Sequence, residues 1–364
     1  MPAVREIQTD DLLARCTAAA RLTWADARVE GLRRLEGGVS SLTFASSLVL
    51  GPDTEPAVRP VVVKVAPPGL APVRNRDVLR QAVVLRALAG TEGFPVPPVL
   101  FTDPGRPPEV PPLFAMGLLP GESYEALLDV TERPPTPEVA AERMRVAARA
   151  LARLQSQDPA AYGLGAEPVS TVRDELDRWV RLFETVDADI APGWADLAHR
   201  LAARIPEPIA PALLHGDYRV ANMLFVGDRL EAVIDWEIWS VGDPRADVAW
   251  LLMHSAPAQV FHEHRPAADV HAGSLMPSAG ELVATYAEAR RGLGATEADI
   301  AAVTGELDWF LALCHFKTAS TIAVIWKRER KSDAPSERMA VAGAHLPAVL
   351  AAGHRALDQP AQPH

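Results

Sequence analysis

The chain has 364 residues, of which 48% are hydrophobic and 23% charged, so it is long enough to bury a core in two or three domain-sized units. Its net charge of -11 argues against a nucleic-acid partner, which would need a basic face. No run approaches the roughly 20 apolar residues that span a bilayer, and the N-terminus is acidic where a signal peptide is apolar. We therefore expect a cytoplasmic protein with no membrane partner. Cys16 and Cys314 lack the spacing of a disulfide framework or a zinc site.

The first 115 residues alternate short strand-like runs with proline-rich turns. Residues 42–50 and 60–66 are rich in β-branched and apolar side chains, and the pattern predicts two paired antiparallel strands. A helix is predicted over 74–90, with Gln81, Val84, Leu85 and Leu88 on one face and Gly90 as the stop. The runs VPPVLF and PLFAMGLL predict two further strands. These patterns indicate a small sheet domain with one helix.

From about residue 138 the chain becomes rich in alanine and leucine, which predicts long helices. One of them places Met144, Ala147, Leu151 and Leu154 on a single stripe. The sequence thus predicts a sheet domain followed by a larger helical domain, with a boundary near residues 117–121.

Residues 213–235 interrupt the helical part with short strand-like runs around a Gly-Asp turn. Polar residues stand in or beside this apolar sequence: His215, Asp217, Asn222 and Asp235. Carboxylates placed next to apolar strand residues lose solvation unless a cation compensates them. Magnesium bridging nucleotide phosphates is such a cation.

This arrangement, H-G-D-x-x-x-x-N followed by I-D-W, resembles the catalytic loop and metal-binding aspartate of the aminoglycoside phosphotransferase family, within the protein-kinase-like superfamily. The resemblance implies an α+β, two-lobed fold, with an N-lobe of antiparallel sheet plus one helix (1–116), a hinge (117–121) and a mainly helical C-lobe (122–364). It implies transfer of a phosphoryl group from ATP or GTP, with Mg²⁺, to a hydroxyl of a small molecule. A monomer or a homodimer is expected.

By the same resemblance Asp217 orients or deprotonates the acceptor hydroxyl, and Asn222 and Asp235 hold magnesium. His215 is expected to fix the loop backbone. Arg219 is either a cation that stabilises the transferred phosphate or a surface arginine. Asp247, which heads an apolar helix after G-D-P, is expected to bind backbone N–H groups of the catalytic loop or of its own helix.

The N-terminal half supplies the residues expected to bind the nucleotide. Lys64 alternates with Val61, Val63 and Val65, so it projects from the opposite face of the sheet, as the phosphate-binding lysine of this fold does. The turn EGGVSSLTF stands where a phosphate loop would be, although it lacks G-x-G-x-x-G. Further residues expected at the nucleotide, by position in the family pattern, are Gly38, Ser40, Ser41, Gln81, Met116, Gly117, Leu118 and Leu119.

Gln81 departs from the family, which has a glutamate there that pairs with the lysine. A neutral amide still accepts a hydrogen bond from Lys64 but without the charge-assisted part, of order 1 kcal/mol. Asp77, one turn earlier, is a possible substitute. A catalytically silent nucleotide-binding homologue is therefore an alternative, and a metal-dependent hydrolase using the same carboxylates is a second one.

The acceptor is not readable from the sequence. We expect it beside the helices predicted in 170–204 and 280–330, whose acidic residues would suit an aminoglycoside and whose aromatic residues would suit an acyl or macrolide group: Asp174, Glu175, Asp177, Glu306, Asp308, Trp309 and Phe310. Gln155 stands where relatives often have a histidine, and we expect it to have no part in the chemistry.

Overall fold

The computed structural model describes residues 8–35, 41–52, 56–126, 128–255, 264–332 and 334–358. The chain divides into two units. The first consists of Met1–Gly121 together with Glu231–Trp239, and the second of Glu122–Leu230 and Ser240–His364. The division between residues 121 and 122 coincides with the end of the predicted hinge, whereas residues 231–239 group with the first unit.

The first unit is built on an antiparallel sheet, which in the described part of the chain has five strands in the order β1-β2-β3-β5-β4. The strands are β1 (Arg28–Leu35), β2 (Leu42–Leu50), β3 (Ala57–Val65), β4 (Val99–Asp103) and β5 (Leu113–Gly117). The predicted pairing of the second and third strands is confirmed, with Lys64 opposite Thr43 and Phe114. The prediction of an antiparallel sheet in the N-terminal part is thus correct.

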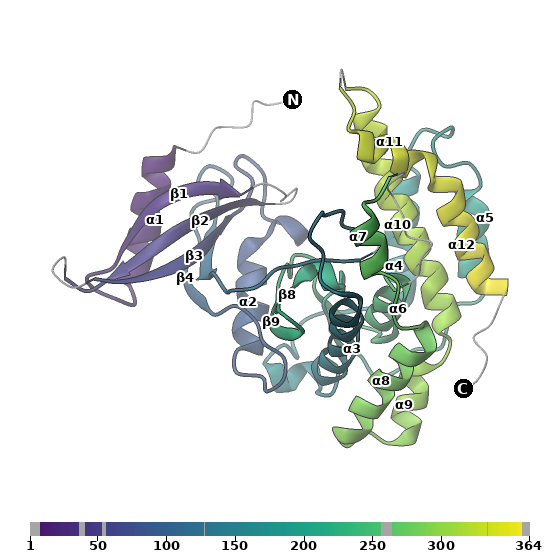
Figure 1. The fold of residues 1–364 in the computed structure, drawn as a ribbon. Helices are drawn as coiled ribbons and strands as arrows, with labels where there is room; N and C mark the ends of the chain where they lie inside the picture. Colours follow the sequence, from purple (N-terminus) through teal and green to yellow (C-terminus); the bar gives the residue numbers. More distant parts are fainter. Residues whose placement is uncertain are drawn as a thin grey trace. The chain divides into compact units, whose positions relative to one another are not determined.

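Helices lie on both sides of this sheet because β3 alternates its side chains. Val61, Val63 and Val65 pack into a core with Leu12 and Cys16 of α1 (Thr9–Arg21), which Figure 1 shows beside the strands. The helix α1 was not predicted. The predicted helix is α2 (Val78–Leu88), preceded by the short helix η1 (Arg74–Arg76), and its expected face of Gln81, Val84, Leu85 and Leu88 is buried.

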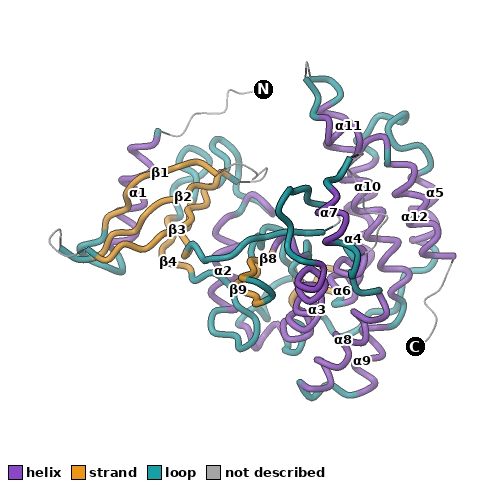
Figure 2. The backbone as a smooth tube through the Cα atoms, viewed as in Figure 1, coloured by secondary structure: helices purple, strands orange, loops and turns teal. Residues whose placement is uncertain are grey.

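Helices dominate the second unit, as Figure 2 shows in purple. They are α3 (Pro137–Leu154), η2 (Pro159–Tyr162), α4 (Val172–Phe183), α5 (Trp194–Ala202), η3 (Val220–Asn222), α6 (Arg245–Met253), α7 (Ala267–Ala272), α8 (Ala279–Gly292), α9 (Glu297–Thr304), α10 (Leu307–Glu329), α11 (Glu337–Ala344) and α12 (Leu346–Asp358). The predicted stripe on α3 is buried in full. Thr136 caps this helix at its N-terminus, and Pro137 begins it.

The helix α10 packs against α4, α6 and α12 and supplies much of the core of this unit. By length and composition the segment Glu297–Glu329 could cross a membrane, but 56% of its most apolar stretch is buried inside the protein. Its apolar character is that of a core helix of a globular unit.

Short strands stand among these helices, as predicted. β7 (Ala212–Leu214) pairs with β10 (Ser240–Gly242), which also pairs with β6 (Val169–Ser170). After the loop that follows β7 come β8 (Met223–Val226) and β9 (Arg229–Val233), with Gly227 at φ +63° in the turn between them. Arg143 of α3 donates to the Gly227 carbonyl oxygen at 2.8 Å, which fixes this turn on the helix.

Candidate active site

The loop after β7 is held by hydrogen bonds to its backbone. Asp247 of α6 accepts the N–H groups of His215 at 2.6 Å and Gly216 at 3.0 Å, which is one of the contacts expected of it. The fully buried His215 accepts the N–H of Asp217 on Nδ1 at 3.2 Å. Gly216 has φ +84°, a conformation that glycine adopts readily, and this turns Asp217 away from the strand direction. The loop is therefore set before any ligand binds.

The carboxylate of Asp217 is oriented on both of its oxygens. Oδ2 accepts from Asn222 Nδ2 at 2.7 Å, and Oδ1 accepts from Trp250 Nε1 at 2.8 Å. Arg219 Nε lies 3.4 Å from Oδ1. Burial disfavours the ionised form, but the positive charges of Arg219 and Lys317 outweigh it and hold the pKa of Asp217 well below its usual value. Asp217 is therefore a fixed, ionised carboxylate.

Arg219 is bound to a buried carboxylate that the sequence analysis did not single out. Its Nη1 lies 2.5 Å from Glu125 Oε2, and Glu125 is only 1% exposed. Burial raises the pKa of Glu125 to about 7, although the Arg219 charge acts in the opposite direction. Glu125 Oε1 has no hydrogen-bond partner among the described residues. Of the two expectations for Arg219, a free surface arginine does not fit this geometry.

Three further side chains near the loop were missed: Trp250 on α6, His254 at the C-cap of that helix, and Lys317 on α10. His254 donates from Nδ1 to the Trp250 carbonyl oxygen at 2.7 Å, and burial lowers its pKa to about 4, so the ring is neutral at neutral pH. Asp247 and Trp250 are three apart on one helix and so share a face, which is a signal that the sequence contained. No local pattern marks Lys317 or Glu125, because their partners are distant in sequence.

The first unit holds a second polar cluster around Lys64, which is 8% exposed. Its Nζ donates to Gln81 Oε1 at 3.1 Å and to Asp235 Oδ1 at 2.9 Å. Gln81 thus occupies the lysine's partner position. Asp77 does not substitute for the glutamate, because its carboxylate caps α2 by accepting from the N–H groups of Leu79 and Arg80. That alternative is wrong, and the physical reason is that an N-cap carboxylate is already engaged.

Asp235 lies two residues after the end of β9 with φ +66°, in the left-handed region that non-glycine residues seldom adopt. Such a conformation is kept only where surrounding structure imposes it. Here Trp236 is 1% exposed and packs edge-on against Phe94 at 6.0 Å between ring centroids. The conformation leaves the Asp235 side chain 39% exposed beside Lys64.

The expected hinge residues follow the end of β5. Met116 and Gly117 belong to the strand, and Leu118 is 44% exposed. The N–H of Gly117 donates to the Pro98 carbonyl oxygen and that of Leu118 to the Pro60 carbonyl oxygen, each at 3.0 Å. These two donors are engaged, so a base bound by Gly117–Leu119 would use other backbone atoms of this segment.

In the expected phosphate turn, Ser41 is buried, while Gly38 and Ser40 lie outside the described residues.

Three of the five acidic residues expected at the acceptor have other partners in the second unit. Asp174 closes the capping box of α4, Glu175 accepts from Trp179 Nε1, and Glu306 pairs with the buried Arg245. Trp309 and Phe310 are buried core residues. The cations Arg219 and Lys317 lie near Asp217, and Glu125 is bound to Arg219.

Gln155 has an architectural role. It is 4% exposed, donates from Nε2 to the Pro244 carbonyl oxygen at 3.0 Å and accepts from the Tyr286 hydroxyl at 2.7 Å. These bonds tie the end of α3 to the start of α6 and to α8.

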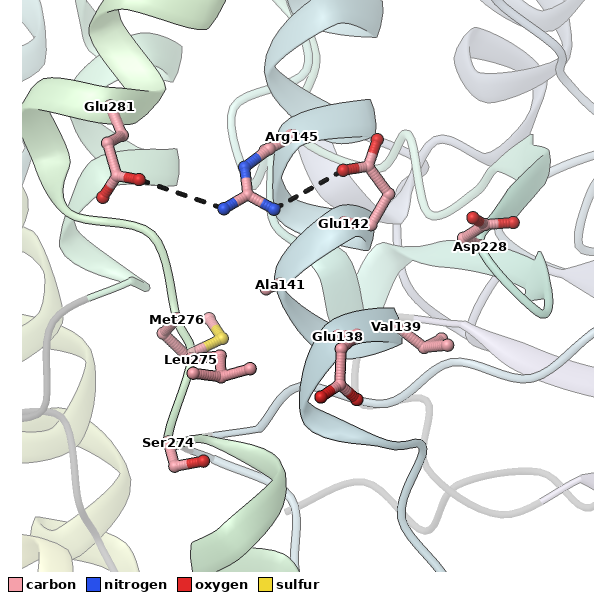
Figure 3. A pocket seen from close by; sticks show the side chains of 10 residues that line it. All are labelled: Glu138, Val139, Ala141, Glu142, Arg145, Asp228, Ser274, Leu275, Met276 and Glu281. Atoms are coloured by element: carbon pink, nitrogen blue, oxygen red, sulfur yellow. Dashed lines mark hydrogen bonds and ion pairs between the residues drawn. The ribbon is translucent and has the colours of Figure 1, made fainter.

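The second unit also contains a pocket of about 720 Å³ that includes none of these residues. It lies between α3, the turn after β8 and the start of α8, and Figure 3 shows Arg145 reaching Glu142 and Glu281 across it. Its lining residues are Glu138, Val139, Ala141, Glu142, Arg145, Asp228, Ser274, Leu275, Met276 and Glu281. Since the oriented carboxylate and the cations that tune it lie elsewhere, the pocket is not the candidate active site.

The donor groups suit a hard divalent cation. Asn222 donates both N–H groups of Nδ2 to Asp217, one to the carbonyl oxygen and one to Oδ2. The amide oxygen Oδ1 of Asn222 is therefore available to bind an ion. Asp235 offers a half-exposed carboxylate. Among the described residues, no group of three or more His, Cys, Asp or Glu side chains could hold a metal. Asn222 Oδ1 in the second unit and the Asp235 carboxylate in the first are each a hard oxygen donor of the kind that magnesium accepts beside phosphate and water oxygens.

Comparison with known proteins identifies relatives. Residues 31–296 match the model of the APH family, described as the phosphotransferase enzyme family. The chain is 30% identical over 212 residues to acyl-CoA dehydrogenase family member 11 of Gallus gallus, covering 55% of this chain and 26% of that protein. It is 26% identical over 181 residues to viomycin phosphotransferase of Streptomyces vinaceus, covering 46% of this chain and 60% of that protein. The chain spans about a quarter of the length of the acyl-CoA dehydrogenase relatives that it matches.

Solved structures agree on the fold. A Ralstonia eutropha protein named for the aminoglycoside phosphotransferases has a TM-score of 0.72 at 22% identity, covering 98% of this chain and 100% of its own. Aminoglycoside phosphotransferase APH(4)-Ia, solved with ADP and hygromycin B, has a TM-score of 0.57 at 17% identity, covering 95% and 99%. These similarities confirm the predicted α+β kinase-like fold, and the family match over residues 31–296 shows that this chain belongs to the APH phosphotransferase family.

Proposed function

We propose that this phosphotransferase moves the γ-phosphoryl group of ATP or GTP to a hydroxyl of a small molecule in the cytoplasm, with magnesium as cofactor. The observation that carries the proposal is the setting of Asp217, whose carboxylate is ionised and oriented on both oxygens. Asn222 and Asp235 would hold the ion, which would neutralise charge on the phosphates. Lys64 would bind the nucleotide phosphates.

In the proposed step the acceptor oxygen forms a bond to the γ-phosphorus while the bond to the β-γ bridging oxygen breaks, and the hydroxyl proton passes to Asp217. A carboxylate with a lowered pKa is a weak base, so Asp217 orients the hydroxyl and receives the proton late. This suits a loose transition state, in which the attacking oxygen needs little activation. Arg219, held 3.4 Å from Asp217, would balance charge on the transferred group.

We propose the acceptor by its chemical class. APH(4)-Ia was solved with hygromycin B, viomycin phosphotransferase is named for an antibiotic, and the acyl-CoA dehydrogenase relatives are named for acyl thioesters. The partners that Asp174, Glu175 and Glu306 already have, and the cation Lys317 near Asp217, make a strongly cationic acceptor less suited to this site. A hydroxylated metabolite, neutral or anionic, fits the charges better than an aminoglycoside.

The test is turnover of magnesium-ATP and magnesium-GTP with aminoglycosides, macrolides, amino alcohols and hydroxyacyl thioesters. We expect transfer to at least one acceptor, and a loss of about 1,000-fold or more in Asp217→Asn, which keeps the shape but removes the proton acceptor. Nucleotide binding by this variant should persist. Unchanged turnover in Asp217→Asn would remove Asp217 from the mechanism.

The alternative is a catalytically silent nucleotide-binding protein, favoured by Gln81 in place of the family glutamate. Single-turnover loss of the γ-phosphate separates the two, because a silent homologue would bind the nucleotide and leave it intact. Membership of a phosphotransferase family argues against the metal-dependent hydrolase.

A further inference from the structure

The loop residue Gly216 is held from both sides by side chains of the second unit. Its N–H donates to Asp247 of α6 at 3.0 Å, and its carbonyl oxygen accepts from the ammonium group of Lys317 on α10. Gly216 immediately precedes Asp217 and has φ +84°, so its two peptide groups set the direction in which Asp217 leaves the backbone. Lys317 therefore bonds to the backbone at the point where the turn is made.

The same ammonium group also lies against the aromatic ring that orients the Asp217 side chain. Lys317 Nζ is 4.0 Å from the ring centroid of Trp250, and Trp250 Nε1 donates to Asp217 Oδ1 at 2.8 Å. A second indole, that of Trp179 on α4, lies 5.5 Å from Nζ. A cation over the face of an indole is attracted to it and restrains its orientation. Lys317 thus reaches Asp217 by two routes, one through the backbone and one through Trp250.

The charge of Lys317 also acts at a distance on Asp217, where it lowers the pKa of the carboxyl. Within the described part of the chain it makes no direct ion pair with a carboxylate, whereas the other nearby cation, Arg219, is bound to Glu125 at 2.5 Å. A core helix that only needed packing at this position would be expected to present an apolar residue, because a half-buried ammonium loses hydration. Its retention against a carbonyl oxygen and two indoles indicates a role at the loop.

We propose that Lys317 is a positioning residue for phosphoryl transfer, which fixes the turn at Gly216 and the indole of Trp250 so that Asp217 points at the acceptor hydroxyl. The proposal rests on the function proposed above. It assigns to α10 a part in catalysis without contact with substrate. It predicts a loss in the chemical step and none in nucleotide binding, since displacing a catalytic group by about 1 Å can cost on the order of 100-fold.

The experiment compares Lys317→Met, Lys317→Arg and Lys327→Met, with magnesium-ATP as probe and single-turnover release of its γ-phosphate as readout. Lys327 lies ten residues later on α10, where it bonds to the Thr185 carbonyl oxygen, and serves as the matched lysine control. We expect Lys317→Met to slow the step about 100-fold with the nucleotide Kd within about twofold of the unchanged protein. Lys317→Arg, which keeps a donor and a cation, should restore most of the rate, and Lys327→Met should match the unchanged protein.

Trp250→Phe tests the second route and remains informative if Lys317→Met folds poorly. It keeps a ring for the ammonium group but removes the N–H that Asp217 accepts. We expect a loss of at least about tenfold, and the double variant should lose less than the product of the two single losses, because both act on one carboxylate. A rate for Lys317→Met within about threefold of the unchanged protein, or losses that multiply fully, would overturn the proposal.

A readout independent of turnover separates this inference from the proposed function. Amide hydrogen exchange over residues 213–223 should be faster in Lys317→Met than in Lys327→Met, because the Gly216 carbonyl loses its donor. If the unchanged protein transfers no phosphoryl group but exchange rises in this way, the proposed function fails while the positioning of the loop stands. Unchanged exchange would contradict the positioning role itself.

Discussion

At the scale of single residues, the candidate site depends on carboxylates whose protonation is set by opposite environments. Asp217 is surrounded by cations and stays ionised, whereas Glu125 is buried with one oxygen unpartnered, and its pKa is raised to about 7. The two are linked by Arg219, which contacts both. We therefore expect Glu125 to affect both the stability of the second unit and the position of the arginine beside Asp217.

Glu125→Gln should change how stability depends on pH. Because the folded-state pKa of Glu125 is raised above the usual 4.5, the ionised carboxyl disfavours folding, and stability is lost as pH rises from 4.5 to about 7. Glu125→Gln lacks this ionisation. The unfolding free energy of the variant minus that of the unchanged protein should therefore increase by up to about 3 kcal/mol as the pH rises from 4.5 to about 8. Urea unfolding at several pH values measures it, with the exposed Glu132→Gln as control. A difference that does not vary with pH would contradict the raised pKa.

Gln81 is engaged with Lys64 through Oε1 and leaves Nε2 without a partner among the described residues. Gln81→Glu would place a charge-assisted acceptor there, so we expect turnover equal to or up to about tenfold above that of the unchanged protein. Gln81→Leu, which leaves Lys64 with Asp235 alone, should lower it. Steady-state kinetics with magnesium-ATP measures both. A large loss in Gln81→Glu would mean that the amide is adapted to this site.

At the scale of elements, the helices of the second unit approach closely where glycine stands. A Cβ added at Gly353 of α12 would lie 2.6 Å from Leu197 Cδ2 of α5, and one added at Gly343 of α11 would lie 2.9 Å from the Trp326 ring of α10. Glycine is unfavourable inside a helix, so its presence at these contacts is explained by packing and not by helix propensity.

Gly353→Ala should therefore destabilise the second unit although alanine favours helix. Displacing Leu197, which is fully buried, should cost about 1–3 kcal/mol and outweigh the gain in propensity. Gly292→Ala near the end of α8 is the control, because nothing lies within 4 Å of its added Cβ, and it should be neutral or stabilising by up to about 1 kcal/mol. Thermal unfolding compares them. Equal melting temperatures would show that Leu197 moves aside freely.

At the scale of the whole molecule, the residues assigned to nucleotide and metal are divided between the two units. Lys64 and Asp235 belong to the first, and Asp217 and Asn222 to the second. The segment that carries Asp235 returns to the first unit after more than a hundred residues of the second.

Magnesium with ATP should raise the melting temperature more than ATP alone, because a ligand that binds the folded state stabilises it by mass action. Asn222→Ala and Asp235→Asn should each remove most of the increment due to magnesium. Chelation with EDTA should do the same in the unchanged protein. Differential scanning fluorimetry measures these shifts, and an undiminished magnesium increment in both variants would rule out their role as ligands.

The sequence by itself determined strands β2, β3, β4 and β5 of the sheet, the helix α2, the α3 stripe and the short strands around residues 213–235, because these depend on local periodicity and turn residues. Strand β1 was not predicted. It also located Lys64, Asp217, Asn222 and Asp235, because their spacing along the chain is fixed. The roles of these four as ligands or catalysts stay predictions.

Only the tertiary structure decided which side chains contact the residues of the candidate site. It placed Glu125 at Arg219, Lys317 at the Gly216 carbonyl oxygen and Trp250 at the Asp217 carboxylate. The physical reason is that these contacts join residues up to a hundred positions apart, and burial, which sets their pKa values and hydrogen bonds, arises only when the helices pack.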